Sequence, residues 1–531
     1  MLIGLLIWGF FSSVVGQQPI VTTKTGQLRG KVVDISPKLK AYQFTSVPFA
    51  EPPTGNRRFR KPVAKEPWDG VLDATTMPNS CPQLNSSSML PFRSDFTTDS
   101  DPTGHQNEDC LYLNIWVPKE MFDSLSNTPD EPPSLLPVFV YIHPGIFSNG
   151  ASTLSVINGS MLATYNNIIV VSIQHRLGAL GFAYMDNEQI PGNMGLWDQV
   201  EALKWLCENI GNFGGNCSET TLGGHGSGAT SVTLHLLSKH SRRYFKRAIV
   251  QSGSALMPFG VNSRGEALQS TDDVIRMVCP NAPSSENDKI DCLMNCDENC
   301  LPLAQVQTRF GLLPVIDGDF LEDDPTTLLL NGDFYQIPMI VGATKDEGST
   351  LVALNPNASI WLPNPMVDND PRLVDRLNFT HYNSLMSHLF EIFSGSAHFD
   401  PILYSAVQLN YWPTKHDGFP EGNEVIRAAV AAASDYSTTC PTLSWLHYAA
   451  QASRNMGQQT FAYHFTQRRA RHPWPTWMGV MHGDDIPYIF GQPLLAGSAS
   501  FGYSFDDRLL SRVMMAQWSN FIKYGYHFKL F

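Results

Sequence analysis

The pentapeptide Gly224–Gly228 has the glycine spacing of a turn that presents a catalytic nucleophile. It reads Gly-His-Gly-Ser-Gly, and it lies between a stretch that reads as a strand and the run Gly228–Lys239, which is typical of a helix. In the pattern glycine-x-serine-x-glycine, the central serine attacks a carbonyl carbon from the tip of a sharp strand-to-helix turn. Here the central residue is Gly226. The sequence therefore provides the turn but not the attacking oxygen.

Segments along almost the whole chain resemble the type-B carboxylesterase and cholinesterase family. Flanking segments match that family without an insertion and place its nucleophile position at residue 226. The resemblance implies an α/β-hydrolase fold, a mixed and mostly parallel sheet with helices on both faces, as one domain over residues 17–531. The apolar run Ile168–Ser172 and the helical stretch Leu196–Leu206 agree with this. The matching segments are Val47–Pro53, Arg58–Pro62, Asn107–Pro118, Gly192–Gln199, Phe213–Gly215, Arg247–Ser254, Pro314–Gly318, Lys345–Ser349 and His482–Gly491.

The resemblance also places Glu347 at the acid and His482 at the base of a catalytic triad, in the chain order typical of this fold. In such a triad the histidine removes the serine proton, and the acid orients the imidazole. Because Gly226 has no proton to give, we interpret Glu347 and His482 as a vestigial pair. Such a pair would persist because removing one partner leaves the other unsatisfied in the interior.

The oxyanion hole of the family lies in a glycine-rich turn after a core strand, here the turn His143–Phe147 after Val138–Ile142. The resemblance assigns its donors to the backbone N–H groups of Gly145, Ile146 and Ser227. The family's three glycines have become Pro-Gly-Ile, and proline has no N–H while a β-branched residue restricts the backbone. We therefore expect a weakened oxyanion hole, since one lost donor costs about 10²–10³ in rate.

Ser227 could itself attack if the turn were shifted by one residue. That register would put His225 where the turn needs glycine, so we favour Ser227 as a capping residue at the start of the following helix. His225 also replaces an acidic residue that cholinesterases carry before their serine.

Choline recognition is predicted to be absent as well. In cholinesterases, a tryptophan of the disulfide loop that corresponds to Cys81–Cys110 contacts the choline head by a cation–π interaction, and here this loop contains no tryptophan. Neuroligins and related adhesion proteins share the lost serine. We therefore predict a catalytically inactive, cholinesterase-like protein that acts by binding an extracellular protein partner.

Two other hypotheses remain open. The chain could be a carboxylic ester hydrolase of weak or unusual activity, acting through Ser227 or through water activated by His482. It could also be a truncated chain without a stable function. We expect neither a cofactor nor a metal, because the acidic clusters have no calcium-loop spacing.

The leader sequence and the glycosylation sequons indicate an extracellular protein. The chain has 531 residues and a formal net charge of −13, which argues against nucleic acid as a partner. Residues 1–16 are predicted to be a signal peptide, and no later apolar run is long enough to span a membrane. Sequons for N-glycosylation occur at Asn85, Asn158, Asn216, Asn357 and Asn378.

The nine cysteines allow at most four disulfides. The resemblance implies the pairs Cys81–Cys110 and Cys279–Cys292. Cys296 and Cys300 could pair locally, and a Cys207–Cys217 pair is open. Cys440 matches a family cysteine whose partner lies further toward the C-terminus than this chain extends. We accordingly expect the closing helices of the family, and the dimer interface that they build, to be absent.

Overall fold

The computed structural model describes most of the chain, and the sheet and the site lie within this part. The described residues are 18–84, 105–124, 134–280, 285–297, 300–305, 308, 310–354, 378–394, 401–412, 422–455 and 457–526. The predicted signal peptide and the sequons Asn85 and Asn357 lie outside them.

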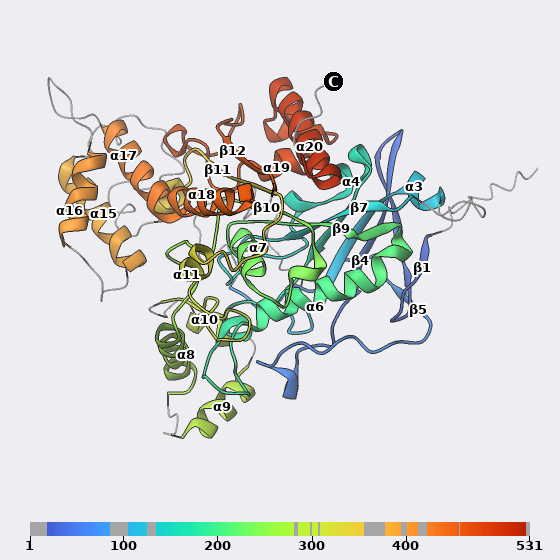
Figure 1. Cartoon of the computed structure of the whole chain (residues 1–531), viewed down its shortest axis with the longest axis horizontal. Helices are drawn as coiled ribbons and strands as arrows, with labels where there is room; N and C mark the ends of the chain where they lie inside the picture. Colours follow the sequence, from blue (N-terminus) through green and yellow to red (C-terminus); the bar gives the residue numbers. More distant parts are fainter. Residues whose placement is uncertain are drawn as a thin grey trace, which may run out of the picture.

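A large mixed sheet forms the centre of the molecule (Figure 1). Among the described residues it has nine strands, in the order β12-β11-β10-β9-β7-β8-β6-β4-β3. Along this order, neighbouring strands pair in parallel from β12 as far as β8, and they pair antiparallel from β8 to β3. Its strands are β3 (Lys31–Ser36), β4 (Leu39–Pro48), β6 (Tyr112–Pro118), β7 (Leu136–Ile142), β8 (Ile169–Ile173), β9 (Gly215–His225), β10 (Arg247–Gln251), β11 (Met339–Thr344) and β12 (Thr460–Phe465). The predicted α/β-hydrolase architecture is confirmed.

A small second sheet is formed by three short strands of the N-terminal region. It consists of β1 (Ile20–Thr22), β2 (Gln27–Arg29) and β5 (Val71–Asp73).

The side chains of β7 show how the two faces of the sheet are buried. Val138, Val140 and Ile142 pack into one hydrophobic core, whereas the alternating Phe139 and Tyr141 pack into a second core. Side chains of a strand point alternately to its two faces, so the sheet carries a core on each side. Strands buried on both faces are typical of parallel sheets that are covered by helices.

Helices α6 and α7 contribute to the first core, and α4, α19 and α20 contribute to the second. Helices α15, α16 and α17 stand apart from both and pack in a separate cluster with α12 (Figure 1). The described helices are α3 (Lys119–Ser124), α4 (Ser160–Asn166), α5 (Gly178–Phe182), α6 (Met194–Asn209), α7 (Ser227–Leu237), α8 (Arg264–Val278), α9 (Glu286–Asn295), α10 (Cys300–Gln305), α11 (Pro325–Leu330), α12 (Ser349–Leu354), α15 (Phe379–Ser394), α16 (Pro401–Tyr411), α17 (Gly422–Ser434), α18 (Cys440–Asn455), α19 (Ile486–Ile489) and α20 (Phe505–Tyr524).

The elements predicted around the site form where they were expected. The run Ile168–Ser172 forms β8, and the stretch Leu196–Leu206 lies within α6. Helix α7 begins at Ser227, but its N-cap residue is Gly226, and no side chain caps the helix. Ser227 is therefore the first helical residue and not a cap, because the capping position falls on the residue that forms the turn.

The disulfides implied by the resemblance, Cys81–Cys110 and Cys279–Cys292, are both present. The two local pairs, Cys207–Cys217 and Cys296–Cys300, are also formed. Cys440 is free and exposed. A disulfide that closes a long loop stabilises the folded protein, because the crosslink restricts the unfolded chain.

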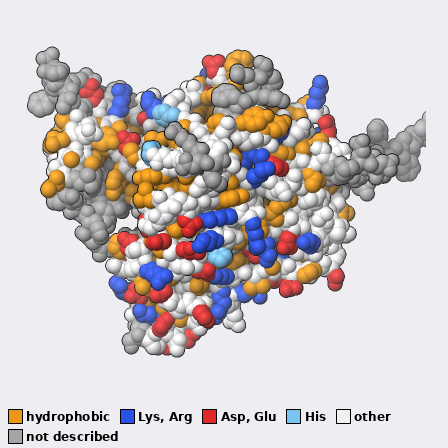
Figure 2. Space-filling view, viewed as in Figure 1, with side chains coloured by type: hydrophobic (Ala, Val, Ile, Leu, Met, Phe, Trp, Pro, Cys, Tyr) orange, Lys and Arg blue, Asp and Glu red, His pale blue; other side chains and the backbone are white. Residues whose placement is uncertain are grey.

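The surface carries charges of both signs. Figure 2 shows Lys and Arg side chains interspersed with Asp and Glu on the face that it draws, without one continuous basic area. Of the sequons within the described part, Asn378 is exposed, while Asn158 and Asn216 are partly buried. Across the described ranges, no helix combines the length and the apolar character needed to cross a bilayer.

Candidate active site

The backbone after β9 forms a sharp turn with Gly226 at its tip. Gly226 has φ 56° and ψ −121°, a conformation in which an L side chain is strained. A Cβ atom at Gly224 would lie 2.5 Å from backbone atoms of Gly228, and one at Gly228 would lie 2.2 Å from the carbonyl oxygen of Ile142. Close backbone approach therefore requires both flanking glycines. The turn geometry of a nucleophile is retained, although the hydroxyl is absent.

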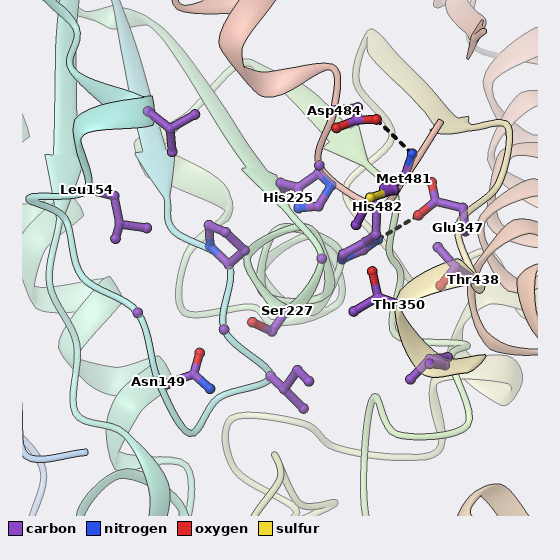
Figure 3. Close-up of a pocket in the computed structure, with 18 of the residues that line it drawn as sticks. Asn149, Leu154, His225, Ser227, Glu347, Thr350, Thr438, Met481, His482 and Asp484 are labelled. Carbon is purple, nitrogen blue, oxygen red and sulfur yellow. Dashed lines mark hydrogen bonds and ion pairs between the residues drawn. The ribbon is translucent and has the colours of Figure 1, made fainter. Parts of the chain in front are cut away.

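Glu347 and His482 form a hydrogen-bonded pair beside this turn (Figure 3). Glu347 follows β11, and its Oε2 accepts from His482 Nδ1 at 2.5 Å. Its other oxygen, Oε1, accepts from the backbone N–H of Thr344 at 2.6 Å. The Glu347 side chain is fully buried, whereas that of His482 keeps 33% exposure. The pair thus has one end fixed in the interior and one nitrogen toward the cavity.

Charge attraction within this pair sets both pKa values. Burial by itself raises the pKa of Glu347, but attraction to His482 and the hydrogen bonds that it accepts lower that pKa overall. Burial lowers the pKa of His482, and attraction to Glu347 outweighs this effect, so the pKa of His482 is raised. Near neutral pH, Glu347 is a carboxylate that stabilises the protonated imidazole.

The space in front of His482 is where a nucleophile would stand. A Cβ atom placed on Gly226 would lie 3.0 Å from His482 Nε2 and 3.8 Å from Pro144 Cβ. This nitrogen therefore faces the position from which a serine hydroxyl would donate its proton. The structure leaves that position without a side chain.

The turn after β7 has a backbone with positive φ angles and contains the N–H groups of Gly145 and Ile146. Gly145 has φ 143°, and both Ile146 and Phe147 have positive φ, at 54° and 56°. The carbonyl oxygen of Gly145 accepts from the N–H groups of Ser148 and Asn149 at 3.0 and 2.9 Å. Within the described part of the chain, the N–H groups of Gly145 and Ile146 have no acceptor. Both residues line the cavity, and the Ile146 side chain is 56% exposed.

The proline of this turn does not weaken the oxyanion hole in the way that the sequence suggested. Proline occupies position 144, which precedes the donor positions, so it removes neither of the two N–H groups. Ile146 keeps its N–H at the cost of a backbone conformation that is unfavourable for a β-branched residue.

Ser227 is the first residue of α7. Its side chain lines the cavity, and in Figure 3 its hydroxyl points toward the loop that carries Asn149 rather than toward His482. Among the described contacts no hydrogen bond joins the Ser227 hydroxyl to His482. Its backbone N–H belongs to the first turn of α7, where N–H groups have no partner within the helix.

A cavity of 440 Å³ adjoins these groups. Its volume suits a small organic molecule. Most of the wall is apolar, contributed by Ile146, Phe147, Leu154, Val156, Met257, Phe259, Leu351, Ala353, Trp474, Met478, Met481, Pro487, Tyr488 and Tyr503. Its described polar lining includes two residues that the sequence did not single out, Arg469 and His472. Their only signal was their place a few residues after the strand β12.

A buried polar cluster lies behind His482. The ring of His225 is 4.3 Å from the ring of His482, and its Nε2 lies 4.0 Å from Asp485 Oδ1. Asp485 Oδ2 accepts from Tyr463 Oη at 2.7 Å and from Gln251 Nε2 at 3.0 Å. Burial raises the pKa of Asp485 to about 6, whereas burial and repulsion from His482 hold the pKa of His225 well below its usual value. Sequence reasoning had quoted Asp485 in a motif without giving it a role.

Comparison with known proteins is consistent with this geometry. The model of the carboxylesterase family matches residues 17–529. This chain belongs to the carboxylesterase family. Relatives include acetylcholinesterase 1 of Caenorhabditis briggsae, 35% identical over 498 residues, which cover 91% of this chain and 75% of that protein. Acetylcholinesterase 1 of Caenorhabditis elegans is 35% identical over 500 residues, with the same two shares.

The prediction that this carboxylesterase-family chain is not an enzyme is wrong. Identity of 35% over 91% of the chain to acetylcholinesterases points to a family of active esterases. The physical reason lies in the site, where the Glu347–His482 pair, the turn at Gly226 and the N–H groups around the cavity all persist. The sequence argument had let one missing oxygen outweigh these groups.

Proposed function

We propose that this protein hydrolyses carboxylic esters, with His482 as a general base acting on a water molecule in place of the absent serine. The observation that carries the proposal is the position of His482 Nε2, 3.0 Å from where a Cβ of residue 226 would lie, in a histidine held at 2.5 Å by Glu347. Since Gly226 leaves that place open, a water molecule can stand where a hydroxyl would.

In the proposed reaction, water attacks the ester carbon while His482 Nε2 takes its proton. The negative charge that develops on the carbonyl oxygen is stabilised by the N–H groups of Gly145, Ile146 and Ser227. The carbon–oxygen bond to the alcohol then breaks, and the proton passes from His482 to the departing alkoxide. The products are a carboxylic acid and an alcohol, and no acyl-enzyme forms.

The expected rate is low for this family. Removing the nucleophile of a serine triad costs about 10⁶ in rate, and the remaining site still accelerates the reaction about 10³–10⁴-fold over water. We therefore expect this protein to accelerate ester hydrolysis by about 10³–10⁴-fold over water. Acetylcholinesterases are named for a choline ester, and the absence of a tryptophan between Cys81 and Cys110 supports a different alcohol for this chain.

We also propose that the protein works outside the cell. Four disulfides support an oxidising compartment, and the predicted signal peptide and the sequons agree with it.

A second candidate function is binding of another extracellular protein, alongside hydrolysis. The observation that favours it is Gly226, since a site without a covalent step suits a chain whose turnover is not its main task. Cells that display the protein would aggregate with partner cells, and His482→Gln would leave that aggregation unchanged. Aggregation no greater than with undecorated cells would exclude this candidate.

Hydrolysis of p-nitrophenyl butyrate tests the main proposal. We expect the purified protein to exceed the spontaneous rate about 10³-fold, and His482→Gln to lose about 10²-fold or more of this excess. His447→Gln is the matched control, because His447 is exposed on α18 and does not line the cavity. Turnover that is equal in both variants would refute the role of His482. Turnover that disappears in Ser227→Ala would instead assign the attack to the Ser227 hydroxyl.

A further inference from the structure

We propose that Asp484 and His472 form a second histidine–carboxylate pair at this site, which positions the imidazole of His482 for its reaction with water and ester. This inference rests on the proposed ester hydrolysis and assigns it two positioning residues. Both residues line the cavity, and the side chains of His472 and Asp484 are only 5% and 20% exposed.

Asp484 holds the turn that carries the imidazole. Its Oδ2 accepts from the backbone N–H of Met481 at 2.8 Å, and its own N–H donates to the carbonyl oxygen of Met481 at 3.1 Å. His482 lies between these two residues, and Figure 3 shows Asp484 beside Met481, with His482 next to Glu347. The direction of the His482 side chain therefore depends on a turn that the Asp484 carboxylate closes.

His472 in turn holds Asp484. Its Nε2 donates to Asp484 Oδ1 at 3.1 Å, and its Nδ1 lies 3.3 Å from the backbone nitrogen of Trp474. A backbone N–H can only donate, so Nδ1 is the acceptor there and Nε2 carries the proton that Asp484 accepts. Both oxygens of the carboxylate are thus acceptors, one toward each of its two neighbours.

The loop that carries His472 is itself anchored. Arg468 donates to three backbone carbonyl oxygens along this loop, those of Trp474, Pro475 and Gly479. The imidazole of His472 consequently stands on a segment that is tied at several points, and it can fix Asp484 against the same loop.

A second carboxylate restrains the same turn from the other side. Asp346 Oδ2 accepts from the N–H of Val480 at 2.8 Å, and the N–H of Asp346 donates to the carbonyl oxygen of Val480 at 2.8 Å. Asp346 directly precedes Glu347, which binds His482 Nδ1. The turn after β11 therefore holds both the imidazole and the backbone just before it, while Asp484 and His472 hold the backbone at and after it.

The bonds of Asp484 require a carboxylate. In Asp484→Asn, the side-chain oxygen can accept from Met481 or from His472, but the amide NH₂ then opposes a donor on the other side. One of the two bonds is lost, and the turn is free to move. Displacing a reacting group by about 1 Å can cost about 10²-fold in rate.

The first test measures kcat for p-nitrophenyl butyrate on the plateau above the inflection of the pH profile. Burial lowers the pKa of His482, attraction to Glu347, Asp485 and Asp484 raises it, and His225 also faces the ring. On the plateau His482 is neutral in every variant, so a change in its pKa does not alter the rate.

We expect Asp484→Asn and His472→Phe to lower this plateau kcat by about tenfold to 10²-fold. His472→Gln should keep most of it, because the glutamine amide can still donate to Asp484. Asp506→Asn is the matched control, since Asp506 is exposed on α20 and does not line the cavity. A raised KM with an unchanged kcat would instead mean that these side chains contact the substrate, and it would overturn the proposal.

The second test does not depend on turnover. Proton NMR on protein with isotope-labelled histidine detects the proton of His482 Nδ1, which a short bond to a carboxylate shifts downfield and protects from exchange with water. We expect this signal in the unaltered protein, in His472→Gln and in Asp506→Asn. In Asp484→Asn and His472→Phe it should move upfield and broaden, because the displaced ring is no longer held at 2.5 Å from Glu347 Oε2.

The outcomes separate positioning from charge and from stability. An unchanged plateau kcat in both variants overturns the proposal, even if their melting temperatures fall. A loss in Asp484→Asn alone would assign the effect to the charge of Asp484 and overturn the pair. If Asp484→Asn does not fold, His472→Phe decides, since it leaves the carboxylate in place. The predicted NMR changes in a protein without turnover would refute the proposed function and leave this inference standing, whereas turnover that both variants retain would refute this inference alone.

Discussion

Restoring a hydroxyl at the tip of the turn should convert this site into a serine esterase. In Gly226→Ser, the new Cβ would lie 3.0 Å from His482 Nε2 and 3.5 Å from its Cε1. Ordinary carbon contacts are about 3.5–4.0 Å, so the imidazole has to shift by a few tenths of an ångström. His482 can do this because its ring borders the cavity. The hydroxyl then falls within hydrogen-bond reach of Nε2.

The size of the gain reports on the oxyanion donors. A triad nucleophile is worth about 10⁶ in rate, and one lost donor costs about 10²–10³. A gain near 10⁶ would mean that all three donors work, and a gain of about 10³ that one is misplaced. Because the N–H groups of Gly145 and Ile146 have no other acceptor among the described residues, we expect at least about 10³.

The assay combines ester turnover with covalent labelling. Gly226→Ala is the matched control, since it adds the same Cβ at φ 56° without an oxygen. Both variants should be destabilised by about 1–3 kcal/mol, because a side chain is strained in this conformation. An organophosphate should label residue 226 in the serine variant and nothing between residues 224 and 228 in the unaltered protein. A folded serine variant with less than a tenfold gain would refute the geometric argument.

Four further predictions concern titration and thiol chemistry. The pKa of His482 is raised, and only the neutral imidazole can act as a base. The rate of hydrolysis should therefore fall as the pH drops, with an inflection above the usual histidine value of about 6.5. An inflection below about 6.5 would contradict this. Asp485→Asn should shift that inflection to lower pH, because the Asp485 charge helps to raise the pKa of His482. The pKa of Asp485 is raised from 3.8 to about 6 in the folded protein, so this group contributes stability that is present below pH 3.8 and lost as the pH rises through 6. In denaturant unfolding, the unaltered protein should therefore lose stability relative to Asp485→Asn over this pH range. Parallel stability curves for the two proteins would refute this. Without reduction, maleimide should modify Cys440 alone, and slowly at neutral pH because burial raises its pKa; labelling of any other cysteine would contradict the disulfide pattern.

Local sequence was enough to predict the elements around the site. The glycines at 224 and 228 have no room for a Cβ, and this steric requirement appears directly as a sequence pattern. The apolar runs that became β8 and α6 are equally local signals. The disulfides at Cys81–Cys110 and Cys279–Cys292 followed from the family resemblance and are confirmed.

The cap at α7 was predicted wrongly for a local reason. A serine next to a helix start is a common cap, but the turn places Gly226 in the capping position and moves Ser227 into the helix. The one-residue shift depends on the backbone angles of the turn, which residue types alone do not specify.

What the sequence determined by itself is the chemistry that is present: a turn without a hydroxyl at Gly226, an acid at Glu347 and a base at His482. What only the tertiary structure decided is which groups meet. Glu347 and His482 are 135 residues apart, and Arg469 reaches the same cavity only because β12 is parallel to β11. The pKa of Asp485 depends on burial and on donors from Tyr463 and Gln251, the latter 234 residues away. Such contacts arise when the strand ends converge at one edge of the sheet, and no local pattern encodes that convergence.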